Sequence, residues 1–336
     1  MAVTIHDIAR ELDLSAMTVS RVLNRPESSS IAPATKERVL KAAASMGYRP
    51  NRHAKALVTK RLNTVALWID HLHSSVYSQI AHACREEIQR AGLQLEICEM
   101  DWHFGKPESQ RRFEWMVDGV IAVDPPEASA LAALMANAPL DHIPRVNLGS
   151  AVSVAWEGDY VRVDLQLGAR VAIEHLLGQG CRRIAYVVPA GLDRSGVGNY
   201  DAYTDTMRAA GKVPEYIVLE DLSLPAVRDA ARRYVQGHGQ PDGVFCHYDE
   251  LTIAVFRALR DLNLRVPQDV LIVGCEGNEF MEYFDPPLST VAMPARELVR
   301  IAWELLQNRM EHPEAEPKGV LVPHQFHLRQ SAIAPR

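Results

Sequence analysis

The stretch S15-AMTVSRVLN-24 decides how the first part of this chain folds. At helical spacing its apolar side chains Val19 and Val22 lie on one face, and Ile8 and Leu12 form a matching face just upstream. Only a three-residue segment separates the two predicted helices. Two short helices with so tight a connection are typical of a helix-turn-helix, which lays its second helix in the major groove of DNA. The sequence therefore predicts a DNA-binding head.

Hydroxyl side chains stand where each of these helices begins. Thr4 precedes the first helix, with Asp7 three positions later, and Ser15 precedes the second. A hydroxyl at this position accepts a hydrogen bond from the first turn, and a nearby carboxylate suits the positive end of the helix. We therefore expect Thr4 and Ser15 to be N-caps.

The first turn of the second helix faces the base edges when such a head docks. Ala16 and Met17 are then placed to contact thymine methyl groups, and Arg21, one turn on, to reach guanine or phosphate. Thr18 and Ser20 suit phosphate oxygens, which position a protein without reading sequence. For Met17 the competing interpretation is a core position, because methionine often fills gaps.

A third helix is predicted over 34–47, ending at Gly47. The basic segment 49–61 follows, and its apolar part around Leu57 is too short for a stable isolated helix. We expect this hinge to fold against DNA or against its copy in a dimer, with Leu57 as a minor-groove wedge. The alternative is a solvated linker. The predicted DNA-binding residues are Thr4, Ser15, Ala16, Met17, Thr18, Ser20, Arg21, Asn24, Asn51, His53, Ala54 and Leu57.

Charge is distributed unevenly along the chain. Residues 1–61 carry 11 Lys and Arg against 5 Asp and Glu, a net charge of +6, whereas residues 62–336 carry 25 against 37, a net charge of −12. A basic head on an acidic body suits phosphate binding at one end only. No apolar run is long enough to span a membrane, and the polar N-terminus is unlike a signal peptide. We therefore expect a cytoplasmic protein without a membrane partner.

Enzyme and metal signatures are missing from the sequence. The five cysteines are scattered without a C-x-x-C pair, which is typical of reduced, buried thiols. There is no P-loop, no G-x-S-x-G elbow and no H-E-x-x-H. We expect no catalytic site, metal or cofactor.

Strand-like apolar runs alternate with helical segments from residue 62 onward. The predicted strands are 63–70, 93–100, 119–124 and 143–149, and then 183–189, 216–220, 243–247 and 269–274. Such alternation predicts parallel sheets flanked by helices. The repeated rhythm predicts two similar doubly wound α/β lobes with a cleft between them.

Several motifs carry a family resemblance. T4-IHDIARELDLSAMTVSRVLN-24, V39-LKAAASMGYRPN-51 and D285-PPLSTVAMP-294 resemble the lactose/galactose repressor (LacI/GalR) family. The Met-Thr-Val-Ser-Arg form of the second helix is most similar to the gluconate-repressor branch. The resemblance implies a periplasmic-binding-protein-like core with chain crossovers near residues 160, 291 and 320. It also implies a homodimer on a pseudo-palindromic operator, with Leu57 opening the minor groove at its centre.

The expected domains follow from these observations. They are a helix-turn-helix domain over 1–48, a hinge over 49–61 and an effector-binding and dimerisation domain over 62–336, with an N-lobe of about 62–161 and 292–322 and a C-lobe of about 162–291 and 323–336.

Ligands of open α/β sheets bind beyond the carboxyl ends of the strands. Polar groups that converge there with aromatic faces suit a small hydroxylated molecule. The expected effector contacts are Asp70, His73, Tyr77, Trp102, Arg194, Ser195, Asn199, Tyr248, Glu276 and Met293.

Four of these positions depart from the family pattern. Asn199 stands where relatives usually carry an arginine or lysine that clamps the effector, so Arg194 is expected to supply that charge. Glu276 replaces the usual aspartate, Met293 a polar residue of sugar-responsive members, and Tyr248 the common asparagine. The effector's identity is therefore not transferred from the family.

Some of these residues also have a structural interpretation. Asp249 is expected to cap the helix predicted over 252–263, His73 is equally compatible with a plain loop, and Trp102 with a cover for the lobe edge. Taken together, the sequence predicts a DNA-binding regulator, most simply a repressor, controlled by a small polar metabolite such as a sugar or sugar acid. The alternatives are a corepressor-dependent regulator that responds to a non-sugar metabolite, and a solute-binding protein without a regulatory role.

Overall fold

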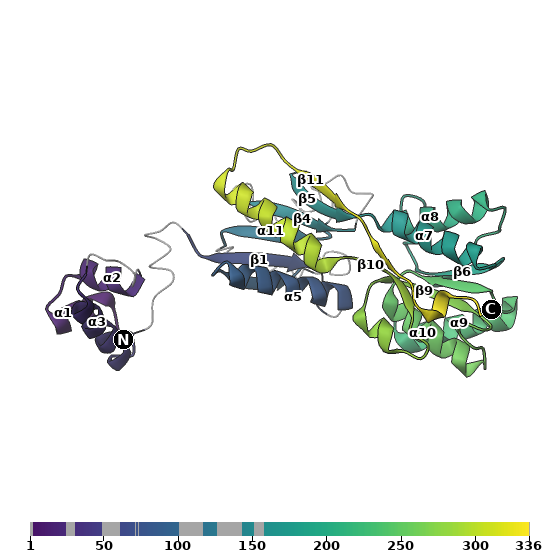
Figure 1. The fold of residues 1–336 in the computed structure, drawn as a ribbon, viewed down its shortest axis with the longest axis horizontal. Coiled ribbons are helices and arrows are strands. Elements are labelled where there is room, and N and C mark those ends of the chain that lie inside the picture. The colour runs from purple at the N-terminus through teal and green to yellow at the C-terminus, as the bar shows by residue number, and fades with distance from the viewer. Residues whose placement is uncertain are drawn as a thin grey trace. The chain divides into compact units, whose positions relative to one another are not determined.

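The computed structural model describes residues 3–24, 31–48, 61–70, 72, 74–100, 117–125, 143–150 and 158–335. The chain divides into two compact units, residues 1–62 and 63–336 (Figure 1). Asn51, His53, Ala54, Leu57, His73 and Trp102 lie outside the described residues.

The first unit contains three helices. They are α1 (Ile5–Leu12), α2 (Ala16–Asn24) and α3 (Pro33–Ser45). Their buried apolar side chains are Ile8, Ala9, Val19, Val22, Val39 and Ala43. The predicted faces of the first two helices therefore meet, and the third completes the core. Gly47 adopts a φ of +67° just after α3, as expected of a residue that ends a helix.

The second unit contains two six-stranded sheets, and the first belongs to the N-lobe. Its strands are β1 (Thr64–Ile69), β2 (Gln94–Glu99), β3 (Gly119–Val123), β4 (Arg145–Gly149), β5 (Asp159–Val163) and β11 (Gly319–Val322). They lie in the order β11-β5-β4-β3-β1-β2, and every pairing is parallel. The helices α5 (Ser75–Arg90) and α11 (Ala295–Glu311) pack against each other and cover one face of this sheet.

The second sheet belongs to the C-lobe. Its strands are β6 (Ile184–Pro189), β7 (Glu215–Leu219), β8 (Gly243–Cys246), β9 (Leu271–Glu276), β10 (Ser289–Ala292) and β12 (Gln325–His327). They lie in the order β12-β10-β9-β8-β6-β7, and only the β10–β12 pairing is antiparallel.

Helices cover both faces of the C-lobe sheet. They are α7 (Leu165–Gly178) and α8 (Gly198–Ala209) on one face, α9 (Leu224–His238) and α10 (Asp249–Asp261) on the other, with the short 3-10 helices η3 (Glu279–Tyr283) and η4 (Gln330–Ala332) nearby. Along β6, Tyr186 packs into the first layer and Val187 into the second. Burial on both faces explains why this strand is apolar throughout.

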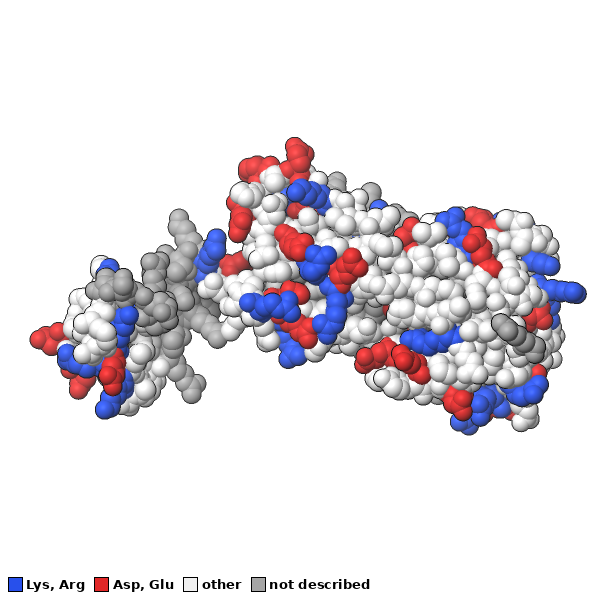
Figure 2. Space-filling view, viewed as in Figure 1, with Lys and Arg blue, Asp and Glu red and all other residues white. Residues whose placement is uncertain are grey.

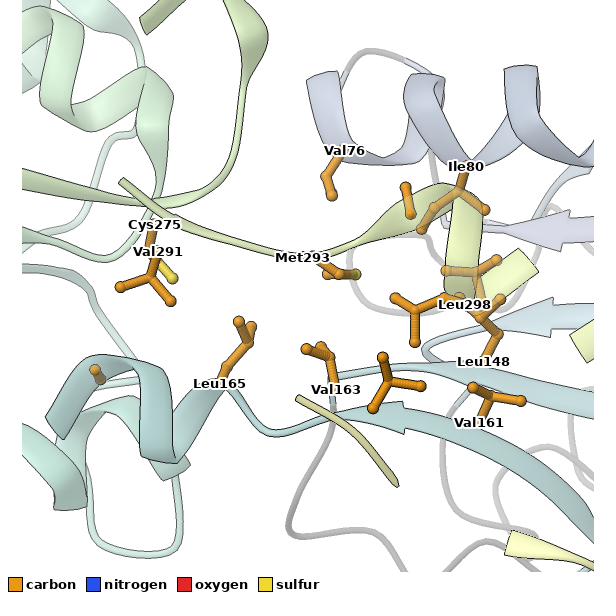
Figure 3. Packing of buried hydrophobic residues seen from close by; sticks show 14 of the residues in the cluster. Val76, Ile80, Leu148, Val161, Val163, Leu165, Cys275, Val291, Met293 and Leu298 are labelled. Atoms are coloured by element: carbon orange, nitrogen blue, oxygen red, sulfur yellow. The ribbon is translucent and has the colours of Figure 1, made fainter. Parts of the chain in front are cut away.

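The chain passes between the lobes where β5 leads to α7, where β10 leads to α11 and where β11 leads to β12. Figure 3 shows Val163, Leu165, Val291 and Met293 from these crossovers within one buried cluster that extends into both lobes. Gly168 lies where they meet, because an added Cβ would be 2.4 Å from Val291 Cγ1 and 3.0 Å from the His324 ring. The lobes therefore share a continuous apolar core.

Four strands were not predicted from the sequence: β5, β10, β11 and β12. In β5, the sequence DYVRV alternates polar with apolar residues, and the other three have only three or four residues each. Such short or mixed segments give a weak strand signal. They lie beside the crossovers and complete one edge of each sheet.

Candidate nucleic-acid interface and effector site

Side-chain caps hold the start of both helices in the predicted helix-turn-helix. Thr4 Oγ1 accepts a hydrogen bond from the Asp7 backbone at 3.4 Å, and the Thr4 backbone donates to Asp7 Oδ2 at 2.9 Å. This capping box satisfies two donors reciprocally, and the hydrogen bond from the Thr4 side chain keeps the pKa of Asp7 below its usual value. Ser15 Oγ accepts from the Thr18 backbone at 3.0 Å. Both predicted N-caps are confirmed.

The second helix, α2, has one buried face and one exposed face. Val19 and Val22 are buried, whereas 70% of the Met17 surface is exposed and Arg21 is exposed as well. Met17 is therefore not a core residue. Arg21 Nη2 lies 4.0 Å from Met17 Sδ, so these two side chains share the exposed face.

The other predicted contacts of α2 are half-buried. Ala16 packs against the head core, and Thr18 Oγ1 lies 2.8 Å from Ser15 Oγ. Ser20 is half-buried, and Asn24 ends the helix. Met17 and Arg21 are therefore the most exposed of the predicted DNA contacts whose burial on α2 is described.

Acidic and aromatic side chains meet where strands of the two lobes end. Asp70 follows β1 and Asp124 follows β3 in the N-lobe, whereas Glu276 ends β9 in the C-lobe. Glu250, in the first turn of α10, accepts a hydrogen bond from the Ser75 backbone of the N-lobe at 3.3 Å. We call the set Asp70, Tyr77, Asp124, Tyr248, Glu250 and Glu276 the junction cluster.

The members of the junction cluster raise one another's pKa values. Burial raises the pKa of Glu276 well above its usual range, and Glu250, Asp249 and Asp124 raise it further. Burial also raises the pKa of Tyr77, with Asp124, Tyr248, Asp70 and Glu276 as further causes. Glu276, Tyr77 and Tyr248 keep partial solvent exposure. Each of the three therefore presents part of its side chain to solvent.

Asp249 has a different role from the predicted cap. The cap residue of α10 is Tyr248, and Asp249 is the first residue of the helix. Its carboxylate accepts hydrogen bonds from the Gly277 backbone at 2.9 Å, the Asn278 backbone at 2.6 Å and Thr290 Oγ1 at 2.7 Å. Its three partners come from other elements, so the N-cap interpretation is wrong. Asp249 fastens the turn after β9 to α10.

Gly274 makes room for this arrangement. A Cβ at this position would lie 2.2 Å from Asp249 Oδ1 and 2.6 Å from Thr252 Oγ1. Burial raises the Asp249 pKa to about 7, although its backbone and hydroxyl donors lower it. The turn that follows Glu276 is therefore hydrogen-bonded to the fully buried carboxyl group of Asp249.

Two other predicted effector residues, Asn199 and Met293, and the neighbouring His247 are buried inside the protein. Asn199 is buried, and its Nδ2 lies 3.8 Å from Cys275 Sγ, beside Glu276. Met293 is buried in the core shared by the lobes. His247 is buried with its Nδ1 2.5 Å from the Tyr186 hydroxyl, and burial lowers its pKa to about 4. These three side chains are more buried than the partly exposed residues of the junction cluster, and each exposes less than a tenth of its surface.

Arg194 and Ser195 lie apart from this set. Both are exposed in the turn after β6, and within the described ranges no contact joins either to the junction cluster. Two residues that sequence reasoning missed belong to the cluster: Asp124 and Glu250. Asp124 ends a predicted strand, as Asp70 does, so the rule that selected Asp70 also points to it.

A second hollow lies beside the crossover into α11. It is a groove of about 800 Å³ lined by residues such as Gln79, His82, Phe280, Arg296 and Gln325. None of the predicted effector residues lines it. On the face drawn in Figure 2, acidic and basic side chains are interspersed, and ion pairs such as Arg300–Glu304 at 2.7 Å follow α11.

None of the helices among the described residues has both the length and the apolar surface needed to cross a bilayer. No three His, Cys, Asp or Glu side chains among these residues converge in a way that would hold a metal ion.

Comparison with known proteins covers both units. Residues 4–51 match the family described as bacterial regulatory proteins, lacI family, and residues 173–332 match the periplasmic binding protein-like domain. The chain is 27% identical over 342 residues to the HTH-type transcriptional regulator RegA of Clostridium saccharobutylicum, covering 99% of this chain and 100% of that protein.

Solved structures agree in fold. A lac repressor dimer bound to operator and the anti-inducer ONPF is similar with a TM-score of 0.85 and 22% identity, covering 99% of this chain and 100% of that one. A complex of the regulator CelR with cellobiose is similar with a TM-score of 0.65 and 26% identity, covering 98% and 99%. With a helix-turn-helix head, a two-lobed core and relatives along its whole length, this chain belongs to the LacI family of bacterial transcriptional regulators.

Proposed function

We propose that this protein is a homodimeric repressor that binds a pseudo-palindromic operator and changes its operator affinity when a small polar metabolite occupies the junction cluster. The observation that carries the DNA-binding part is the exposed face of α2, where Met17 and Arg21 stand free of the head core. Side chains on such a face reach base edges in the major groove.

Dimerisation follows from the geometry of such sites. A single small head contacts too few bases for strong specificity, and two-fold operators match two-fold proteins. The hinge, including Asn51, His53, Ala54 and Leu57, is proposed from the sequence alone to fold on DNA, with Leu57 as the minor-groove wedge. Leu57→Ala should weaken operator binding and leave effector binding intact. Equal operator affinity of the variant and the unaltered protein would contradict the wedge.

The form of α2 supports a gluconate-repressor-like branch for the operator contacts. The effector is a separate question, because the lobes and not the head would bind it. CelR in complex with cellobiose supports a sugar-class effector at the equivalent lobes. Carboxylates and tyrosine rings, as in the junction cluster, suit hydroxyl groups and apolar sugar faces.

The DNA-reading function is tested by selecting operators from random duplexes with the purified protein. Met17→Ala should change which bases are selected, because Met17 lies in the first turn of the helix that faces them. The matched control is Leu40→Ala, since Leu40 is an exposed apolar residue of the same head, on α3, with 49% of its surface exposed. A change in overall affinity without a change in base preference would show that Met17 is not a reader.

The regulatory function is tested by measuring operator affinity with and without effector. The effector acts only through different affinities for the two states of the protein. A compound that lowers operator affinity is an inducer, and one that raises it is a corepressor. If no compound that binds the core changes operator affinity, the two functions are not coupled and the proposal fails.

A further inference from the structure

The exposed face of α2 carries a sulfur atom. Met17 is the second residue of this helix, and 70% of its surface is exposed. The other methionines that the structure describes are half-buried or buried, and they are Met46, Met100, Met207, Met281, Met293 and Met310. All five cysteines are buried. Within the described ranges, Met17 is therefore the sulfur-containing side chain that is most open to solvent.

Arg21 lies one turn along from Met17 on the same face of α2. Side chains four residues apart on a helix are neighbours, and Arg21 Nη2 lies 4.0 Å from Met17 Sδ. A thioether sulfur is only a weak hydrogen-bond acceptor, so this contact leaves the guanidinium group available to other partners. A change in the polarity of the sulfur therefore acts directly on Arg21.

Oxidation is the chemistry that changes the polarity of a methionine. A sulfur lone pair attacks one oxygen of hydrogen peroxide, the O–O bond breaks, and the products are methionine sulfoxide and one molecule of water. The sulfur loses two electrons and the peroxide gains them. The side chain changes from apolar and flexible to polar and chiral. At Met17 this reaction places a strong hydrogen-bond acceptor beside Arg21.

We propose that Met17 is an oxidation site through which peroxide weakens recognition of the operator. The sulfoxide oxygen accepts a hydrogen bond from the Arg21 guanidinium group, which then no longer offers its full set of donors to guanine or phosphate. The polar side chain also loses the apolar contact with a thymine methyl group. The proposal rests on the proposed function, since it takes α2 as the helix that reads the bases. It makes the head a sensor that is separate from the effector site of the lobes.

The test compares the full-length protein before and after treatment with hydrogen peroxide. Catalase removes the peroxide before DNA is added, and peptide mass spectrometry locates the added oxygen. We expect Met17 to be oxidised before the half-buried Met46 of the same head. Affinity for an operator selected with the untreated protein should fall by about tenfold or more, the effect of losing one good base contact. The far-UV circular dichroism spectrum should not change, because Met17 lies outside the head core.

Matched variants separate Met17 from the other groups that peroxide oxidises. Met17→Leu removes the sulfur, so this variant should bind an operator selected with it equally well before and after peroxide. Met46→Leu keeps the sulfur of Met17 and should lose affinity as the unaltered protein does. Because two methionine sulfoxide reductases together reduce both epimers of the sulfoxide, treatment with both enzymes should restore operator affinity, whereas dithiothreitol alone should not.

The outcomes that would overturn the proposal are distinct from one another. Met17 that stays reduced while Met46 reacts would show that the site is not reactive. Unchanged operator affinity with Met17 oxidised would show that the sulfoxide has no effect on recognition. An equal loss of affinity in Met17→Leu, or a loss that the reductases do not reverse, would assign the effect to another group. A protein that selects no operator before any peroxide is added would contradict the proposed function, and with it this proposal.

Discussion

The head and the lobe junction both use carboxylates, but in opposite ways. Asp7 in the head sits at an exposed helix start, where the Thr4 backbone and hydroxyl both donate to it. Glu276 at the junction is largely enclosed, has other carboxyl groups around it, and shares a hydrogen bond with one of them, Glu250. The first carboxyl group has a lowered pKa and stabilises its own helix in the ionised form. The second has a raised pKa because burial and its acidic neighbours oppose ionisation.

The largest expected effect on stability is at Asp249, which lies next to Glu250 at the junction but accepts three hydrogen bonds from the protein. Asp249→Ala leaves the Asn278 backbone without its acceptor, and it leaves the Gly277 backbone and the Thr290 hydroxyl with only their longer hydrogen bonds, of 3.2 and 3.5 Å. At about 1–3 kcal/mol for each buried group, the free energy of unfolding of the core should fall by roughly 4 kcal/mol. Urea unfolding followed by tryptophan fluorescence measures this. Asp249→Asn, which keeps an acceptor, should lose less, and an unchanged stability for Asp249→Ala would rule out the fastening role.

The next prediction concerns pH. His247 has a pKa of about 4 in the folded protein because it is buried, and of about 6.5 when unfolded. The unfolded state thus binds more protons between these values, so His247 costs about 3 kcal/mol of stability as the pH falls from about 6.5 to 4. Asp249 acts in the opposite direction, because its pKa is raised to about 7 and its protonation favours the fold.

The contribution of His247 is isolated by comparison with a variant that cannot titrate. The stability difference between the unaltered protein and His247→Gln should change by about 3 kcal/mol across that pH range. Chemical denaturation at a series of pH values measures it. If the two proteins keep a constant difference, His247 is not held neutral by burial.

A smaller effect is expected at the crossovers. Gly168→Ala places a Cβ 2.4 Å from Val291 Cγ1, so the packing must shift. Overpacking of this kind costs typically about 2 kcal/mol. Gly178→Ala in the same helix is the control, because nothing lies within 4 Å of the added Cβ, and it should leave stability equal or slightly higher. Equal behaviour of the two variants in thermal unfolding would contradict the close approach.

The smallest effect is expected in the head. Thr4→Ala removes the capping hydroxyl, and the stability of the head should fall by about 1 kcal/mol. Thr4→Ser keeps the hydroxyl and should behave as the unaltered protein does. Thermal unfolding of the full-length variants, followed by circular dichroism, measures the change in the stability of the head. A loss of the same size in both variants would mean that the hydroxyl is not the cause.

The same contrast explains what could be predicted from sequence. Caps and faces of the head come from residues three or four apart, so Thr4, Ser15, Val19 and Val22 were all found by spacing. Most strands of the lobes were found because each is a short, nearly continuous apolar run. The fold class is confirmed by the two parallel sheets and by the solved relatives.

The junction could be predicted only in part. Glu276, Tyr248 and Asp70 were found because they follow strands, but the bond between Glu250 and Ser75 joins residues 175 positions apart. Asp249 was misassigned because an acid at a helix start is usually a cap, and its real partners lie 28 to 41 residues away. Spacing carries no information about such contacts. Arg194 was selected because it follows a strand and could supply the charge that Asn199 lacks, but its exposure in that turn could not be predicted from either observation.

The meeting of the three crossovers at Gly168 has a mechanical consequence. Val291 and His324 both lie against the first turn of α7. Because closely packed interiors have few voids and transmit strain, a shift of one crossover has to be accommodated by the other two.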